Sequence, residues 1–332
     1  MEKRKLGNSS LELTTIGFGS WAIGGGDWKF GWGAQDEREA IDAVVAAVDL
    51  GINWIDTAAV YGGGVSETIV GRALKALGPT RQPIIATKCG RVMRGPDQID
   101  KVLKRDSIIK ECEDSLSRLG CECIDLYQLH WPEPDADIEE GWSTLVDLKA
   151  QGKVREIGVS NHSVGQLERL QAIHPVASLQ PPYSMIKPAA ENELLPYCGG
   201  QEIGVICYSP MYKGLLTGKF TQEHIKTLDP RDHRLFDPEF QSPMLDAHLG
   251  LVECLASVAD SAGRTLAELA IAWVLRRQEV TAAIVGARRP EQIAETVKAA
   301  DWVLSDAEIQ TITQLLAGHQ HALRASAVVH PG

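Results

Sequence analysis

Four side chains able to transfer or hold a proton stand just after short apolar runs. Asp56 follows the run 52–55, Lys88 ends "PIIATK" and His130 ends "IDLYQLH", while Tyr61 comes five residues after Asp56. If these runs are parallel strands of a barrel, their carboxyl ends meet at one mouth. We therefore expect the four side chains to lie close together.

These four residue types together suit the reduction of a carbonyl group. A tyrosine alone titrates near pH 10, and a neighbouring lysine cation is expected to lower that pKa. Asp56 could pair with Lys88, and His130 could hydrogen-bond the oxygen that Tyr61 protonates. Alone, each residue has a structural explanation, such as an ion pair or a buried tyrosine. Jointly they predict general acid catalysis with polarisation of a carbonyl.

The elements that would carry these residues alternate between short apolar runs and helical patterns. Strands are predicted at 14–20, 52–57, 83–88, 124–130, 154–160, 177–182, 203–210 and 282–287. Helices are predicted at 36–50, 67–77, 106–119 (capped by Asp106), 138–150, 164–171, 189–198, 244–261, 265–277, 290–300 and 306–316. No run alternates strictly, as is typical of strands buried on both faces.

Eight such units predict an α/β fold, a (β/α)₈ TIM barrel, as a single domain over residues 1–332. Extra helices and a long loop without secondary structure, 211–243, are expected after strand seven. A doubly wound sheet is the rival fold, but eight units and no G-x-G-x-x-G fingerprint disfavour it.

Composition limits the partners and the compartment. Of 332 residues, 44% are hydrophobic and 23% charged, and the net charge of −11 disfavours nucleic acid and anionic membranes. The seven cysteines are irregularly spaced, which predicts a reducing cytoplasm and no metal site. No run approaches 18 apolar residues and the N-terminus has no apolar signal region, so neither a membrane span nor secretion is expected.

The motifs around these residues resemble those of a known family. "DTAAVYGGGVSE" is similar to the Asp-x-x-x-x-Tyr-Gly-x-x-x-x-Glu signature of the aldo-keto reductase superfamily, matching at Asp56, Tyr61, Gly62 and Glu67. "ATKCG" and "LYQLHWP" supply the lysine and histidine of its tetrad, and the resemblance runs from about residue 5 to 304. "GARRPEQ" resembles the bacterial branch that contains stress-induced and inositol-cluster reductases. The resemblance implies carbonyl reduction with a 4-pro-R-type hydride transfer.

Hydride transfer requires a cofactor, and two loops are suited to hold its phosphates. "YSPMYKGLLTGKF" follows strand seven, and its glycines would let backbone N–H groups approach a pyrophosphate. "VGARRPEQIAE" opens a helix, where Arg288 and Arg289 add cations for a further phosphate. This basic turn in an acidic chain favours NADP(H) over NAD.

The resemblance also implies individual contacts. Ser160, Asn161 and Gln180 would lie near the nicotinamide carboxamide, and Tyr208 would stack on its ring. The full predicted cofactor set is Gly19, Ser20, Trp21, Asp56, Ser160, Asn161, Gln180, Tyr208, Ser209, Met211, Lys213, Gly214, Gly218, Lys219, Gly286, Arg288, Gln292 and Glu295. Thr296 stands where many relatives have the asparagine of the adenine site.

A small-molecule carbonyl substrate is expected at the mouth, in contact with Trp21, Tyr61, His130, Trp131, Tyr183 and Arg231. Trp28 and Trp32 also fall near mouth loops, and the segment 229–240 is expected to act as a cofactor clamp or a substrate lid. Because that segment holds Asp232, His233 and Arg234, a polar, hydroxylated aldehyde is favoured over a steroid.

Two other functions stay open. One is a redox-sensing regulatory subunit like the β subunits of channels, which keep the same tetrad. The other is an aldolase with Lys88 as a Schiff base, disfavoured because a lysine paired with Asp56 stays charged. The oligomeric state is left open.

Overall fold

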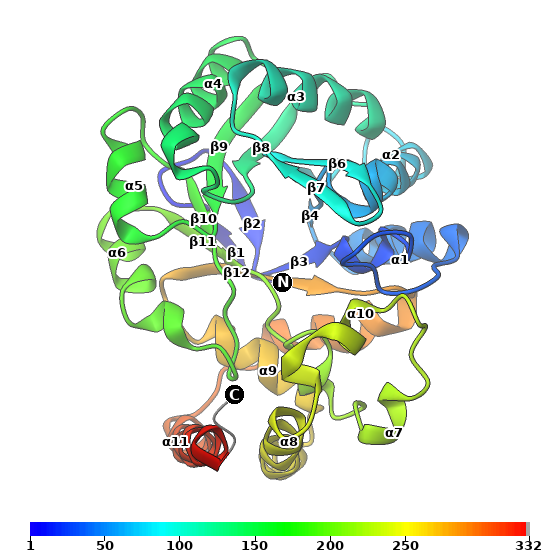
Figure 1. Cartoon of the computed structure of the whole chain (residues 1–332), viewed down its shortest axis with the longest axis vertical. Coiled ribbons are helices and arrows are strands. Elements are labelled where there is room, and N and C mark those ends of the chain that lie inside the picture. Colours follow the sequence, from blue (N-terminus) through cyan, green and yellow to red (C-terminus); the bar gives the residue numbers. More distant parts are fainter. Residues whose placement is uncertain (330–332) are drawn as a thin grey trace.

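Eight parallel strands close into a barrel in a computed structural model that describes residues 1–329 (Figure 1). The order around the barrel is β10-β11-β12-β3-β4-β5-β8-β9. The strands are β3 (Ile16–Gly19), β4 (Trp54–Asp56), β5 (Ile84–Cys89), β8 (Ile124–Leu129), β9 (Val154–Ser160), β10 (Ser178–Gln180), β11 (Gly204–Cys207) and β12 (Val280–Gly286). The predicted (β/α)₈ barrel is confirmed.

Helices surround the barrel, and two more pack together at one side of it. The surrounding helices are α1 (Glu37–Asp49), α2 (Val65–Leu77), α3 (Arg105–Leu119), α4 (Ile138–Ala150), α5 (Val164–Gln171), α6 (Leu194–Gly200), α9 (Leu266–Leu275) and α10 (Pro290–Thr296). The extra helices α8 (Met244–Ser261) and α11 (Asp306–Val329) lie against each other at the bottom of Figure 1. No helix within residues 1–329 is long and apolar enough to cross a membrane.

Several predicted helix boundaries were wrong. Lys104, not Asp106, is the N-cap of α3, and Asp106 lies inside the first turn. The segment 189–198 divides into a 3₁₀ turn and α6, since Glu193 leaves helical geometry between them. The helix from 290 ends at Thr296 and continues as a 3₁₀ turn, whereas α11 runs well past residue 316.

Two hairpins were not predicted. β1 (Lys3–Lys5) pairs with β2 (Glu12–Thr14), and β6 (Arg91–Gly95) pairs with β7 (Gln98–Lys101) after β5. Both are short and highly charged, so neither shows the apolar pattern of a strand. The only sequence signal for the second hairpin is the turn "GPD" at 95–97.

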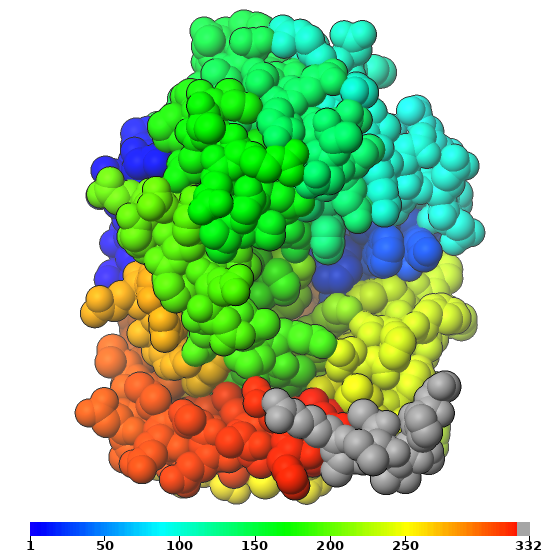
Figure 2. All heavy atoms as spheres, turned by 60° about the vertical axis from the view of Figure 1, so that its left-hand side comes forward, coloured from blue at the N-terminus to red at the C-terminus, as the bar shows by residue number. Residues whose placement is uncertain are grey.

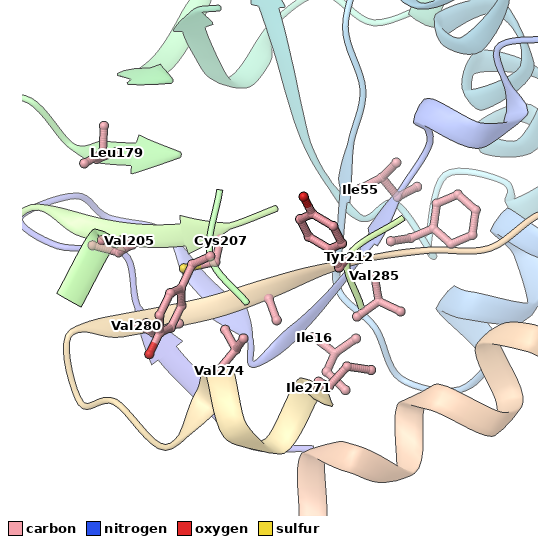
Figure 3. Close-up of a cluster of buried hydrophobic side chains, with 14 of the residues drawn as sticks. Ile16, Ile55, Leu179, Val205, Cys207, Tyr212, Ile271, Val274, Val280 and Val285 are labelled. Carbon is pink, nitrogen blue, oxygen red and sulfur yellow. The ribbon is translucent and has the colours of Figure 1, made fainter. Parts of the chain in front are cut away.

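The apolar core has two layers separated by the strands. Outward-facing side chains pack against helices, as Figure 3 shows for Ile16, Val280 and Val285 beside Ile271 and Val274 of α9. Inside the barrel, Trp54 packs with Leu126 and with leucines from the N-terminal segment. The Trp54 Nε1 also donates to the carbonyl oxygen of Thr14 at 2.9 Å. The N-terminal hairpin therefore closes the barrel at the end opposite the mouth.

The long loop after β11 is partly ordered into short helical turns, contrary to the prediction that it lacks secondary structure. It contains α7 (Gln222–Ile225) and the 3₁₀ turns Leu215–Thr217, His233–Phe236 and Pro238–Phe240. Asp232 and Asp237 cap the last two turns with their side chains. Turned by 60°, the molecule shows the mouth as a hollow bordered by green, blue and yellow segments (Figure 2).

The close fit inside the barrel is testable at Gly17. A Cβ at this position would lie 2.0 Å from Cε2 of Trp54. We expect Gly17→Ala to lower the free energy of unfolding by about 1–3 kcal/mol through overpacking. Urea denaturation of Gly165→Ala, on the exposed face of α5 where a Cβ meets nothing within 4 Å, is the control. Equal midpoints for wild type and Gly17→Ala would show that Trp54 can move aside.

Candidate active site

Lys88 lies at the centre of the mouth and is held by three oxygens. Its Nζ donates to Asp56 Oδ1 at 2.7 Å, to the carbonyl oxygen of Thr57 at 2.8 Å and to Tyr61 Oη at 3.3 Å. Lys88 and Asp56 are both buried. On the other side of Asp56, Gln180 Nε2 donates to Oδ2 at 2.8 Å. The ends of β4, β5 and β10 are thus joined by one hydrogen-bonded group.

The three glycines after Tyr61 place its ring. Gly62, Gly63 and Gly64 have φ angles of 62°, 64° and 100°, which disfavour residues with a side chain. A Cβ on Gly62 would also lie 1.9 Å from the carbonyl oxygen of Gly24. The 3₁₀ turn Tyr61–Gly64 therefore packs directly against the loop after β3.

The pKa of Tyr61 moves in the direction opposite to the one predicted. Burial raises it well above 10, and the carboxylate of Asp56 raises it further. Lys88 does not reverse this, because its cation is already paired with Asp56 at 2.7 Å. Tyr61 is consequently protonated at neutral pH and has a proton to donate.

His130 faces the same position as an uncharged ring. Its centroid lies 5.8 Å from that of Tyr61, in an edge-on arrangement. Burial lowers its pKa well below 6.5, with smaller contributions from Lys88 and Arg91. A neutral imidazole beside the tyrosine can hydrogen-bond a carbonyl oxygen without competing for the proton.

A long cavity of about 2030 Å³ extends from this group of residues to α10. It brings together most of the predicted cofactor residues: Gly19, Trp21, Asp56, Ser160, Asn161, Gln180, Tyr208, Ser209, Met211, Lys213, Gly214, Lys219, Gly286, Arg288, Gln292 and Glu295. The predicted substrate residues Tyr61, His130, Trp131 and Arg231 line it as well, as does Thr296.

The far arm of the cavity carries two lysines and two arginines. Lys213 pairs with Asp237 at 2.5 Å and Lys219 with Glu295 at 2.6 Å. Arg288 donates to Gln35 Oε1 at 2.7 Å, to the Trp32 carbonyl at 3.0 Å and to the Ala34 carbonyl. Arg289 is exposed, and its guanidinium has no partner within residues 1–329. Tyr212, Lys213 and Gly214 have φ angles of 47°, 55° and 92°, a run of left-handed backbone, and Ser209 nearby has a φ of 55°. Cations and a turned backbone in one arm suit a phosphorylated dinucleotide.

Comparisons with known proteins agree with this geometry. Residues 15–317 match the model of the Aldo/keto reductase family. The protein is a member of this family. Its general activity is the reduction of carbonyl compounds with a nicotinamide cofactor.

Relatives of this aldo/keto reductase share most of its length. Aldo-keto reductase YhdN of Bacillus subtilis is 38% identical, over 95% of this chain and 94% of its own. An NADH-specific methylglyoxal reductase of Escherichia coli is 36% identical, over 95% and 98%. The glycerol dehydrogenase AKR11B4 of Gluconobacter oxydans superimposes with a TM-score of 0.85 at 36% identity, covering 96% of this chain and 95% of that one.

Three residues predicted to contact ligands lie outside the long cavity of this reductase. Ser20 is fully buried, and its hydroxyl donates to the Asp56 carbonyl at 2.8 Å while accepting from Ser66 Oγ at 2.7 Å. Gly218 only turns the chain after a 3₁₀ turn, with φ 73°. Tyr183 is buried, donates to Glu191 Oε1 at 2.5 Å and packs on Trp273. The structure therefore does not bring these three residues to the cavity: hydrogen bonds and packing direct the side chains of Ser20 and Tyr183 elsewhere, and Gly218 lies in a turn.

Arg231 reaches the cavity but is not free. Its guanidinium pairs with Asp27 at 2.6 Å and with Asp229 at 3.1 Å. It therefore joins the loop after β3 to the loop after β11.

The sequence interpretation also missed residues that line the cavity. Arg91, Ile99 and Lys101 reach it from the unpredicted hairpin, and Gln35 and Asp36 reach it from the start of α1. The hairpin residues had no usable signal beyond the turn at 95–97. Gln35 lies directly before the helix N-cap Asp36, a position that a barrel places at the mouth.

The position of Ser20 leads to a test. Ser20→Ala should lower the free energy of unfolding by about 1–2 kcal/mol, because two buried hydrogen bonds of its hydroxyl, to the Asp56 carbonyl and from Ser66 Oγ, are lost. Its NADPH dissociation constant should change less than twofold. Denaturation measures the free energy of unfolding, and fluorescence titration measures the NADPH dissociation constant. Ser261→Ala, at the exposed end of α8, is the control. A large loss of NADPH binding at unchanged stability would show that Ser20 contacts the cofactor.

Proposed function

We propose that the protein reduces the carbonyl group of a small, polar aldehyde or ketone with NADPH. The observation that carries this proposal is the contact of Lys88 Nζ with Tyr61 Oη at 3.3 Å, beside the neutral ring of His130, at the end of a long cavity. A buried, protonated tyrosine at this point is suited to act as the general acid.

The residues that would hold the cofactor sit along the cavity. Ser160, Asn161, Gln180 and Tyr208 would surround the nicotinamide, and the loop after β11 would hold the pyrophosphate. Asn161 is fixed for this role, since its Nδ2 donates to the His130 carbonyl at 3.1 Å and its Oδ1 accepts from Tyr208 Oη at 2.9 Å. When bound, the cofactor supplies the hydride that adds to the carbonyl carbon.

The tetrad of Asp56, Tyr61, Lys88 and His130 would then supply the proton to the substrate oxygen. Tyr61 donates its hydroxyl proton to the substrate oxygen, and the phenolate that results lies beside the Lys88 ammonium. Asp56 and the Thr57 carbonyl hold that ammonium in place, so little reorganisation is needed as charge develops. His130 Nε2 would donate a hydrogen bond to the same substrate oxygen. Direct contact of Lys88 with Asp56 also disfavours a Schiff base, which requires a neutral amine.

The choice of NADPH rests on the arginines after β12. The E. coli relative is NADH-specific, so family membership does not decide the cofactor. In this chain, Arg288 and Arg289 both line the cavity near Gln292 and Glu295. Two guanidinium groups at one end of an acidic protein suit a 2′-phosphate dianion.

A small, polar substrate is supported by the walls of the cavity and by two relatives. Trp21, Trp131, Arg91 and Arg231 combine aromatic faces with charge. The relatives are named for glycerol and for methylglyoxal, both three-carbon oxygenated compounds. Such a substrate is the type we propose for this chain.

Tyr61→Phe tests the general acid. The kcat for aldehyde reduction should fall by about two to four orders of magnitude, because the proton donor is lost. The dissociation constant of NADPH should stay within twofold of wild type. Steady-state assays and fluorescence titration measure these quantities, with Tyr197→Phe, on α6, as the matched control. Substantial turnover by Tyr61→Phe would mean that another acid acts.

Arg288→Ala and Arg289→Ala test the cofactor preference. Each should weaken NADPH binding by about tenfold, as expected for the loss of a charged hydrogen bond, and NADH binding by less than twofold. Titration of both variants with both cofactors measures this. Arg38→Ala, at an arginine 90% exposed on α1, controls for the loss of one positive charge. Equal weakening of NADPH binding and NADH binding would show that these arginines do not bind the 2′-phosphate.

A further inference from the structure

Four buried ring nitrogens of residues in the cavity wall have no hydrogen-bond partner within residues 1–329: Nε1 of Trp28, Nε1 of Trp32, Nδ1 of His130 and Nε2 of His233. Two of them, Nε1 of Trp32 and Nε2 of His233, belong to rings that pack against each other. His233 itself is only 7% exposed, and both residues line the long cavity. Buried polar atoms are nearly always paired, and leaving one unpaired costs about 1–3 kcal/mol. An unpaired buried nitrogen in a cavity wall therefore points to a ligand.

The two rings form a cluster that continues from the catalytic tyrosine. His233 packs on Trp21 with centroids 5.0 Å apart and on Trp32 with centroids 4.9 Å apart. Trp21 in turn stacks near Tyr61 at 6.4 Å and meets Trp32 edge-on at 5.3 Å. Trp21 thus lies between Tyr61 and the pair formed by Trp32 and His233. When a substrate carbonyl is placed at Tyr61, a group at the other end of that substrate would reach Trp32 and His233.

Neighbouring groups fix the orientation of both rings. The His233 backbone N–H donates to the Gly31 carbonyl at 2.9 Å, and Trp32 forms a β-bridge with Asp232. The Arg234 guanidinium, paired with Asp232 at 2.7 Å, covers the Trp32 ring at 4.6 Å. The two nitrogens are therefore held in place before any ligand binds.

Hydrogen bonding also decides which nitrogen donates and which accepts. His233 Nδ1 lies 3.1 Å from the Gly31 carbonyl oxygen, which can only accept, so Nδ1 carries the hydrogen. Burial lowers the pKa of His233 to about 4, and Lys213 and Arg234 contribute, so the ring is neutral. Nε2 is then an acceptor, whereas Trp32 Nε1–H is a donor.

We infer that Trp32 and His233 form a subsite for a hydroxyl group of the substrate, which makes hydroxyaldehydes and hydroxyketones the preferred substrate class. This inference rests on the proposed function. A hydroxyl group both donates and accepts, so it can satisfy His233 Nε2 as well as Trp32 Nε1–H. A second carbonyl can only accept and would leave Nε2 unpaired, and an alkyl group would leave both unpaired.

The central experiment compares hydroxylated and unsubstituted aldehydes of equal chain length. His233→Phe keeps a ring but removes the acceptor. We expect its kcat/KM to fall by roughly ten- to a hundredfold for D-glyceraldehyde and D-erythrose, as for a buried polar group left unpaired. For propanal and butanal, kcat/KM should stay within about threefold of wild type. Trp32→Phe removes the donor alone and should show the same selectivity to a smaller degree.

His174→Phe is the matched control, because His174 also bonds a backbone carbonyl through Nδ1 and packs edge-on to a tryptophan, Trp142, outside the cavity. For this control variant, the ratio of kcat/KM for the hydroxylated aldehydes to kcat/KM for the unsubstituted aldehydes should equal that of wild type. Thermal denaturation confirms that each variant is folded, and if His233→Phe does not fold, the ratio for Trp32→Phe decides the inference.

The remaining outcomes separate the possible failures. Equal losses on hydroxylated and unsubstituted aldehydes would overturn the subsite and leave His233 with a packing role. Weaker NADPH binding by His233→Phe, with an unchanged substrate ratio, would also overturn it and show that the hydroxyl belongs to the ribose of the cofactor. Wild-type protein that binds NADPH but reduces none of the four aldehydes would overturn the proposed function itself.

Discussion

The ion pair between Lys88 and Asp56 is the interaction on which the site depends. Both groups are buried, and neither would remain charged there alone, because taking a charge out of water is costly. Removing one partner from such a pair destabilises a protein by about 3–5 kcal/mol. The remaining oxygens are also satisfied: Gln180 donates to Asp56, and Lys88 donates to the Thr57 carbonyl. The pair therefore requires three strand ends to meet within hydrogen-bonding distance, which a closed parallel barrel provides.

Burial sets the protonation state of each group around this pair. It raises the pKa of Tyr61 and lowers the pKa of His130, so that a protonated phenol and a neutral imidazole face one position. The cation of Lys88 does little to acidify Tyr61 before the reaction, because Asp56 balances it. Its effect grows as negative charge develops on the phenol oxygen. Stabilisation that appears only in the transition state raises the rate, whereas equal stabilisation of the ground state does not.

The loops at the mouth are joined to one another by ion pairs and hydrogen bonds. Arg231 links Asp27 to Asp229, and Arg288 holds the carbonyl groups of Trp32 and Ala34. The loop after β3 therefore contacts both the loop after β11 and the turn before α10. Because of this connection, the arm proposed for the cofactor and the aromatic wall proposed for the substrate contact each other. Binding of one ligand would fix part of the site for the other.

The sequence by itself determined the barrel, the four residues at its mouth and the basic turn at 288–289. The reason is local: apolar runs and helical periodicity repeat along the chain and predict the strands and helices. In a parallel barrel the carboxyl ends of all strands lie at the same face. Tertiary structure alone decided which side chains turn toward the cavity. The side chains of Ser20 and Tyr183 point away from the cavity because they form hydrogen bonds with Ser66 and Glu191, respectively. No sequence pattern predicts either of these hydrogen bonds. The direction of the Tyr61 pKa, the hairpin at 91–101 and the unpaired nitrogens of Trp32 and His233 likewise depend on burial and long-range contacts, which no local pattern encodes.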